Sequence, residues 1–201
     1  MEIFKIANNK IKVLFAKILL ILYKFTNIDL LIKIRLKLLI IPSNNSRQYV
    51  GLAFGRSIFN EDIKAINSFS KFLSIDNLSM SYISESLELL MEEKISDINS
   101  YYKDESQRKL LQKSTIKLLE SLINKNNYKF ILGCNYNYLL LQEIHTLSKK
   151  LSIPYIILLK EGIVIMQYSS KKISSNFQKD IPFKADKIIT YNNAIKNNLL
   201  S

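Results

Sequence analysis

Cysteine and histidine are almost absent from this chain of 201 residues. Cys134 is the only cysteine, so no disulfide can form within the chain, as is usual in the reducing cytosol. One cysteine and one histidine cannot supply the ligands of an ordinary zinc site. The sequence therefore indicates a cytoplasmic location, and it points to no metal.

Glycine is also scarce, and its spacing excludes the common nucleotide-binding motifs. Gly51 and Gly55 lie in a short apolar run that continues into Arg56-Ser57. Their spacing matches neither the dinucleotide fingerprint nor the phosphate-binding P-loop. A simple turn explains them as well as a phosphate site does, so we predict no bound cofactor.

Long uncharged apolar runs are missing from the N-terminal region. A membrane-spanning helix needs about 20 apolar residues, and lysines interrupt the apolar core that a signal peptide would require. Apolar residues recur instead every three or four positions, with lysines beside them at Lys10, Lys17 and Lys24. Residues 1–41 are therefore predicted to be an amphipathic basic helical segment. It could lie on an anionic membrane, or pack against the domain or a partner.

Acidic residues are outnumbered, since 17 Asp and Glu face 29 Lys and Arg, which gives a formal charge of +12. That charge suits an anionic partner such as a phosphorylated substrate or an acidic lipid. A codon bias toward A and T explains it equally well, because lysine, asparagine and isoleucine are all abundant. The tyrosines form no pattern of an RNA-stacking platform, so nucleic acid is not expected as a partner.

What the chain does contain is an alternation of short apolar runs and helical patterns after the linker Pro42–Arg47. Strands are predicted at Tyr49–Phe54, Tyr128–Gly133, Pro154–Leu159 and Lys187–Thr190. Alternation without hairpin turns is typical of an α/β, Rossmann-like parallel sheet with helices on both faces. We expect this domain to extend over residues 48–201.

Four further elements are expected between the first two of these strands, among them helices from Glu85 to about Ile98 and over Asp104–Asn124. A helix that starts at Asn60 is predicted to use Ile63, Ile66, Phe69 and Leu73 as its apolar face. A weak strand is predicted near Met80–Ile83.

A charged pair follows the apolar run that ends at Leu159. Ligands of open parallel sheets bind beyond the carboxyl ends of the strands, which is where Lys160-Glu161-Gly162 would lie. Lys160 could neutralise a phosphate or carboxylate, and Glu161 could take a proton from a sugar hydroxyl. The alternative is a solvated ion pair in a turn, where Gly162 supplies only backbone freedom.

Asn135 and Tyr136 follow the preceding predicted strand in the same way. Their side chains, with the free amides of the next helix, could hold an anion or sugar hydroxyls. An asparagine that only caps the helix fits the sequence equally well.

These residues, in their order and spacing, resemble the N-terminal half of bacterial surface-polysaccharide biosynthesis proteins of the GT-B type. Such proteins are similar to CDP-glycerol glycerophosphotransferases and UDP-N-acetylglucosamine 2-epimerases. The run ILGCNYNYLLLQEIHTLSKKLSIPYIILLKEGI matches an asparagine- and tyrosine-bearing turn, a helix with a glutamate (Glu143) and a strand that ends in Lys-Glu-Gly. The run FKADKIITYNNAIKNNLL adds Asp186, Lys187, Tyr191, Asn192 and Lys196.

The resemblance implies an acceptor-side half of a glycosyl- or polyol-phosphate transferase. GT-B enzymes have two Rossmann-like domains, and the nucleotide-activated sugar or polyol donor binds mainly to the second. This chain is expected to hold only the first, with Lys160 and Glu161 facing a saccharide or lipid-linked acceptor in the interdomain cleft. It would be inactive alone.

A different class of protein also fits. The chain could be a non-catalytic binding or assembly module that docks through residues 3–41 at the inner face of the plasma membrane.

Overall fold

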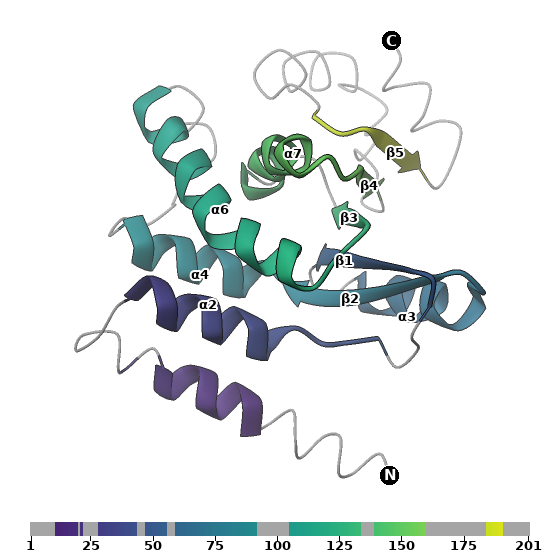
Figure 1. Ribbon diagram of the computed structural model, residues 1–201, viewed down its shortest axis with the longest axis horizontal. Coiled ribbons are helices and arrows are strands. Elements are labelled where there is room, and N and C mark those ends of the chain that lie inside the picture. The colour runs from purple at the N-terminus through teal and green to yellow at the C-terminus, as the bar shows by residue number, and fades with distance from the viewer. Residues whose placement is uncertain are drawn as a thin grey trace, which may run out of the picture.

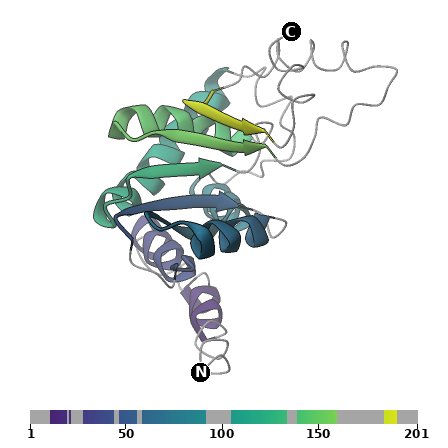
Figure 2. The ribbon, with the colours of Figure 1, turned by 90° about the vertical axis from the view of Figure 1, so that its right-hand side faces the viewer.

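A computed structural model describes residues 11–19, 21, 28–43, 47–55, 59–91, 105–133, 139–159 and 184–190 (Figure 1). Its centre is a five-stranded sheet in the order β2-β1-β3-β4-β5. The strands are β1 (Tyr49–Gly55), β2 (Leu73–Ser79), β3 (Phe130–Gly133), β4 (Tyr155–Leu159) and β5 (Lys187–Thr190). Every neighbouring pair is parallel, so the predicted α/β Rossmann-like fold is confirmed (Figure 2).

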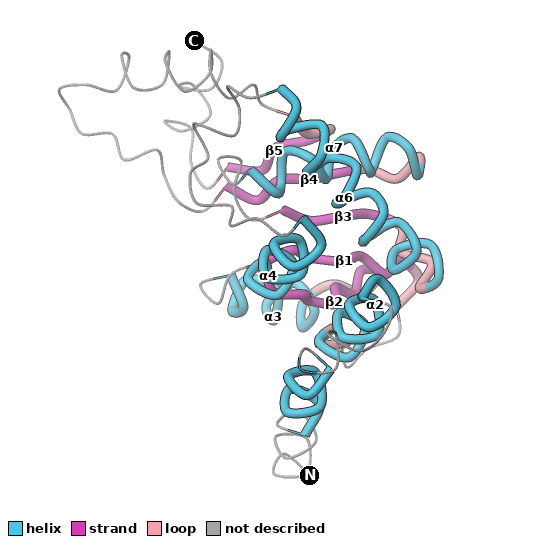
Figure 3. Tube along the Cα trace, turned by 90° about the vertical axis from the view of Figure 1, so that its left-hand side faces the viewer, coloured by secondary structure: helices cyan, strands magenta, loops and turns pink. Residues whose placement is uncertain are grey.

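Side chains alternate between the two faces of the sheet along each strand. Both faces carry apolar side chains, and helices cover both of them. Ala53 and Ile75 meet Ile63 of α3 (Asn60–Phe69) on one face, whereas Leu52 and Phe54 point into a larger core on the other. The helices that close that larger core can be followed in Figure 3. They are α2 (Ile28–Leu39), α4 (Met80–Met91), α6 (Glu105–Lys125) and α7 (Leu139–Leu151), and the N-terminal helix (residues 11–19) adds Ala16.

The region between β1 and α4 differs from the sequence prediction. The strand expected near Met80–Ile83 is wrong, because Met80 begins α4 and the strand is Leu73–Ser79. The prediction also put Phe69 on a buried helix face, yet Phe69 ends α3 and is 86% exposed. The sequence LSIDNLS hid the strand because two central polar residues break its apolar pattern.

Both of these polar residues have partners that only the fold supplies. The Tyr128 hydroxyl donates to Asp76 Oδ2 at 2.9 Å, and the Ser43 amide donates to Asp76 Oδ1 at 2.8 Å. Asn77 Nδ2 donates to Asn60 Oδ1 at 2.9 Å. A strand with polar residues at its centre is stable here because most of their hydrogen bonds are satisfied inside the protein.

The outer edge of β2 is closed by the protein itself. Asn67 of α3 uses its side-chain amide as a backbone mimic, donating to the Ile75 carbonyl at 2.9 Å and accepting from the Ile75 amide at 2.7 Å. Ile41 forms an antiparallel bridge with Asn77, with hydrogen bonds of 2.8 and 2.9 Å. The backbone groups at which another strand would pair are therefore already occupied.

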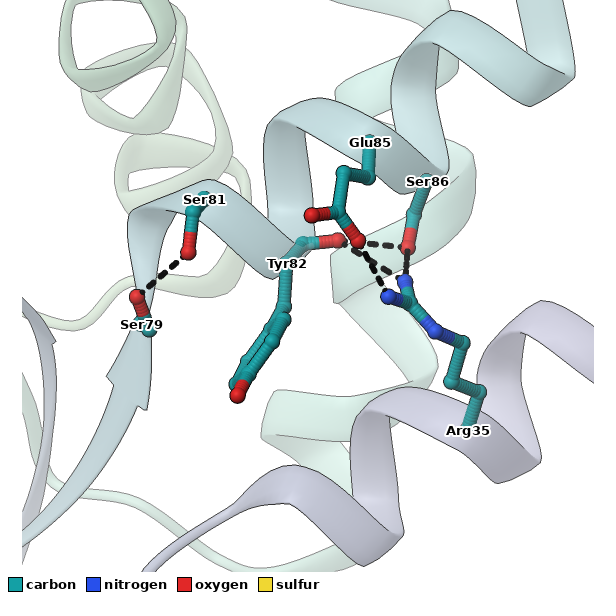
Figure 4. Close-up of polar contacts among 6 residues, drawn as sticks. All are labelled: Arg35, Ser79, Ser81, Tyr82, Glu85 and Ser86. Carbon is teal, nitrogen blue, oxygen red and sulfur yellow. Dashed lines mark hydrogen bonds and ion pairs between the residues drawn. The ribbon is translucent and has the colours of Figure 1, made fainter. Parts of the chain in front are cut away.

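Arg35 joins α2 to α4 (Figure 4). Its side chain is only 4% exposed, and it donates to the Tyr82 carbonyl at 3.2 Å, to Ser86 Oγ at 2.8 Å and to the Glu85 carboxylate. The guanidinium also lies 5.6 Å from the centre of the Tyr82 ring. Three acceptors and a ring face compensate for removing this charge from water.

We predict that Arg35→Ala lowers the free energy of unfolding by about 2–4 kcal/mol, because it leaves a cavity and removes hydrogen bonds to a charged group. Glu85→Ala should cost about 1 kcal/mol or less, since the Glu85 side chain is 51% exposed and water can replace its carboxylate. Urea unfolding of both variants measures the difference. Equal losses would mean that the ion pair, rather than the buried guanidinium with its neutral acceptors, holds α2.

Candidate functional site

The carboxyl edge of the sheet contains a topological switch point. The chain passes from β1 to β2 on one side and then returns to place β3 on the other side of β1. Phe54 of β1 pairs with Gly133 of β3, so the two strands end next to each other. In doubly wound sheets, ligands bind in the crevice at such a point, which makes this edge the candidate site.

The predicted site residues Asn135, Tyr136, Lys160, Glu161 and Gly162 all lie outside the described residues. The strands that lead to them are described. The positions of their side chains are therefore predictions from the sequence. Their points of attachment to the sheet, which are the last residues of β3 and β4, are given by the structure.

Those points of attachment are neighbours. Gly133 of β3 pairs with Ile157 of β4, and Leu159 ends β4 two positions further on. Adjacent strands lie about 4.8 Å apart. The segments that begin after Gly133 and after Leu159 thus leave the same edge of the sheet on adjacent strands.

The described residues at this edge offer hydroxyls and a helix terminus. Gly55 of β1 pairs with Ser79 of β2, and α4 begins at the next residue without a loop. The hydroxyls of Ser79 and Ser81 are 2.8 Å apart, and the first turn of α4 contains no acidic residue. A helix N-terminus carries partial positive charge. The local field at the end of β2 thus favours polar or anionic groups.

A cavity among the described residues lies elsewhere. It has a volume of about 410 Å³ and opens beside β2, between one face of α3 and residues 41–43. Asn60, Asn67 and Asn77 contribute to its walls, but their side chains already hydrogen-bond to one another or to the β2 backbone. These amides hold the edge of the sheet, so we do not assign the ligand site to this cavity.

Glu143 of α7 is the buried acid of the described residues. Its side chain is fully buried, and Gln112 Nε2 of α6 donates to its Oε2 at 2.8 Å and to Thr146 Oγ1 at 3.1 Å. Burial raises the pKa of this carboxyl, although Gln112, Lys184 and Arg108 oppose the shift. Within the part of the chain that the structure describes, Oε1 has no hydrogen-bond partner. A carboxyl in such surroundings keeps its proton more readily and can act as an acid.

In the sequence, Glu143 stood out only as one of the residues that carry the family resemblance. Its neighbours gave a weak physical signal, because a single acid interrupts the apolar start LLLQEI of α7. The burial itself depends on α6, which lies 31 positions away in the chain at Gln112.

Asp186, also part of the resemblance, lies at the opposite edge. Its carboxylate accepts from the Tyr155 amide at 2.8 Å and pairs with Lys149, and its amide donates to the Tyr155 carbonyl at 2.9 Å. The hydrogen bond from Lys149 and that from Tyr155 lower the pKa of Asp186. Asp186 therefore fastens the amino ends of β4 and β5 and is remote from the carboxyl edge.

His145 of α7 is half-buried and packs near the Tyr155 ring. Burial lowers its pKa, while the charge of Asp186 acts in the opposite direction. Within the described ranges, no group of three or more His, Cys, Asp or Glu could hold a metal ion. None of the helices in this part of the chain combines the length and the hydropathy that crossing a bilayer demands.

Comparison of the chain with protein-family models, with curated proteins and with solved structures found no match. The fold is therefore established by the structure alone. The family resemblance of the sequence remains a hypothesis.

The raised pKa of Glu143 predicts a pH-dependent stability. As pH rises from about 4, the unfolded chain ionises this carboxyl first, so the folded state loses stability until its own, higher pKa is passed. Glu143→Gln removes this loss. The free energy of unfolding of the variant, relative to that of the wild type, should therefore be higher at pH 7 than at pH 4. Urea unfolding at the two pH values measures the difference.

Glu105→Gln is the matched control, because Lys109 lowers the pKa of the exposed Glu105 and the sign reverses. The free energy of unfolding of this control, relative to that of the wild type, should be lower at pH 7 than at pH 4. A pH-independent difference for Glu143→Gln would show that Glu143 ionises as easily folded as unfolded.

Proposed function

We propose that this protein is the acceptor-side half of a GT-B-type glycosyl- or polyol-phosphate transferase of bacterial surface polysaccharide biosynthesis. The observation that supports it most is the switch point between β1 and β3 in an entirely parallel sheet. Together with the adjacent ends of β3 and β4, it provides a crevice edge of the kind that binds ligands in doubly wound folds. The sequence places asparagine, tyrosine, lysine and glutamate directly after those two strands.

Each of these residues has one role in the proposed reaction. Asn135 and Tyr136 hold hydroxyls of a saccharide or lipid-linked acceptor, and Lys160 neutralises an anionic group as a point charge. Glu161 takes the proton from the attacking hydroxyl, which forms the new bond to the donor while the nucleotide leaves with the bonding electrons. Gly162 lets the backbone turn after the charged pair.

The donor site belongs, in this proposal, to a second domain. An acceptor site alone cannot hold two reactants in a reactive geometry, and that geometry supplies much of the rate. The chain by itself should thus bind an acceptor and show no turnover. Its place would be the cytoplasm, at the inner face of the plasma membrane, where a lipid-linked acceptor is accessible.

A second candidate function is favoured by a separate observation. The N-terminal helix (residues 11–19) exposes large apolar side chains, as a non-catalytic binding or assembly module on a membrane surface would. Catalysis distinguishes the two functions, since only the transferase half gains activity when a matching second domain is supplied.

We predict that a sugar phosphate, which resembles the head of a lipid-linked saccharide acceptor, shifts the amide resonances of Gly55, Ser79 and Thr190, which lie at the carboxyl edge. Tyr49 and Lys187, at the amino edge, should not shift. Addition or fusion of a matching second domain should then produce transferase activity, and Glu161→Gln should reduce its kcat by about 10²–10⁴-fold, the usual contribution of a general base.

Glu61→Gln serves as the control, because Glu61 is an exposed glutamate of α3 that pairs with Lys64. It should leave the restored activity unchanged. Turnover by the 201-residue chain alone would refute the half-enzyme hypothesis. A restored enzyme that is indifferent to Glu161→Gln would remove Glu161 from the chemistry.

A further inference from the structure

The N-terminal helix has two apolar sides, and only one of them is used. Ala16 and Leu19 are buried, and Val13 packs against the same core. The helix lies beyond α2 at one end of the molecule, as the purple ribbon in Figures 1 and 2 shows. Its outer side therefore faces away from the sheet and from the four helices that cover it.

The outer side carries a continuous row of large apolar side chains, which we name the apolar stripe. Its members are between 42% and 68% exposed, and they are Ile11, Leu14, Phe15, Ile18 and Ile21. Spacings of three and four residues put all of them on one face of a helix. Scattered single apolar residues are normal on a protein surface, but a contiguous row marks a binding surface.

The neighbouring helix also has exposed apolar residues. Leu30 and Ile34 of α2 are also exposed, whereas Ile32 and Leu36 on the opposite face belong to the core. Figure 3 shows the N-terminal helix next to α2 at the same end of the molecule.

The charges around the stripe have one sign. Lys12 and Lys17 lie on the N-terminal helix, and Lys33 and Lys37 lie on α2. Asp29 is the only acidic residue between positions 11 and 41, and it is paired with Lys117 of α6. Apart from its lysines, the N-terminal helix has no side chain that could form the polar rim of a protein–protein interface.

We infer that the apolar stripe docks this protein on the surface of an anionic lipid bilayer. The helix lies in the plane of the interface, with the stripe among the acyl chains and the lysines at the level of the acidic headgroups. The inference concerns the N-terminal helix alone and does not depend on the transferase activity. It also explains why a helix that already packs on the domain keeps a second apolar face.

A bilayer fits this surface better than a protein partner does. Interfacial helices combine aliphatic and aromatic residues on one face with lysines at its borders, and they need no hydrogen bonds from that face. Acidic lipids supply the negative potential that the lysines require, and each lysine near such a surface strengthens binding by about 5-fold. A second copy of this chain would instead bring the lysines of two stripes together.

The absence of tryptophan from the chain allows a direct test. Phe15→Trp in the full chain places a single tryptophan in the apolar stripe, and Phe69→Trp places one at an exposed site at the end of α3. With vesicles of phosphatidylcholine and phosphatidylserine (3:1), the emission of the first variant should shift to shorter wavelength and that of the second should not. Vesicles of phosphatidylcholine alone should have little effect.

Co-sedimentation with the same vesicles provides the quantitative test. Phe15→Ser with Ile18→Ser should weaken binding by about 10-fold or more, because it removes apolar area from the contact. Lys17→Gln, which changes an exposed lysine of the N-terminal helix and none of its apolar residues, should weaken binding by about 5-fold, and added salt should weaken binding of the wild type. Substitutions are preferable to deletion of residues 1–41, because α2 is part of the core.

Phe69→Ser with Phe72→Ser is the matched control, since it removes two exposed aromatic residues from another part of the surface and should bind like the wild type. Equal losses in the stripe and control variants would overturn the inference. So would a wild type that does not sediment with anionic vesicles, or one that forms a dimer which the stripe variant alone disrupts while no vesicle binding is seen.

Discussion

The buried guanidinium of Arg35 is the contact on which the N-terminal part of the molecule depends. It fixes α2 against α4 through three acceptors, and α2 in turn places what precedes and follows it. After α2, the chain forms the bridge from Ile41 to Asn77 that closes the sheet at β2. Before α2, the N-terminal helix packs on the same core and turns its second apolar face outward. A helix held only by apolar contacts could slide or rotate, but three directed hydrogen bonds that one planar group donates define both its depth and its rotation.

The two edges of the sheet differ in chemistry. At the amino edge, Asp186 is fully engaged with Lys149 and the Tyr155 backbone, so its charge is used for structure. At the carboxyl edge, β2 passes directly into α4, whose first turn contains no acidic residue. The hydroxyls of Ser79 and Ser81 lie at the same place. This division is expected of a doubly wound fold, in which one edge holds the strands together and the other is left for ligands.

How far the sequence predicts this structure depends on where each signal lies. β1, β3, β4 and β5 were predicted because a buried parallel strand is a short apolar run, which is a local signal. β2 was missed because its stability comes from residues far away in the chain, Tyr128 and Asn60 among them, which satisfy Asp76 and Asn77. The exposure of Phe69 was missed for a similar reason, since a helical pattern cannot tell where the helix ends and the next strand begins. For the site, the sequence predicted correctly which strands end side by side. The burial of Glu143 required the contact between α6 and α7, which no local pattern contains.

Because the outer edge of β2 is closed, a further strand cannot be added on that side of the sheet. Asn67 and Ile41 act as a permanent stop on one side, while the last described strand on the other side, β5, is short and leaves Ile188 and Ile189 exposed. Any additional strand, from this chain or another, must therefore join beside β5 or not at all. The occupied edge of β2 protects against indefinite edge-to-edge stacking, because such stacking needs an open edge on both sides of the sheet.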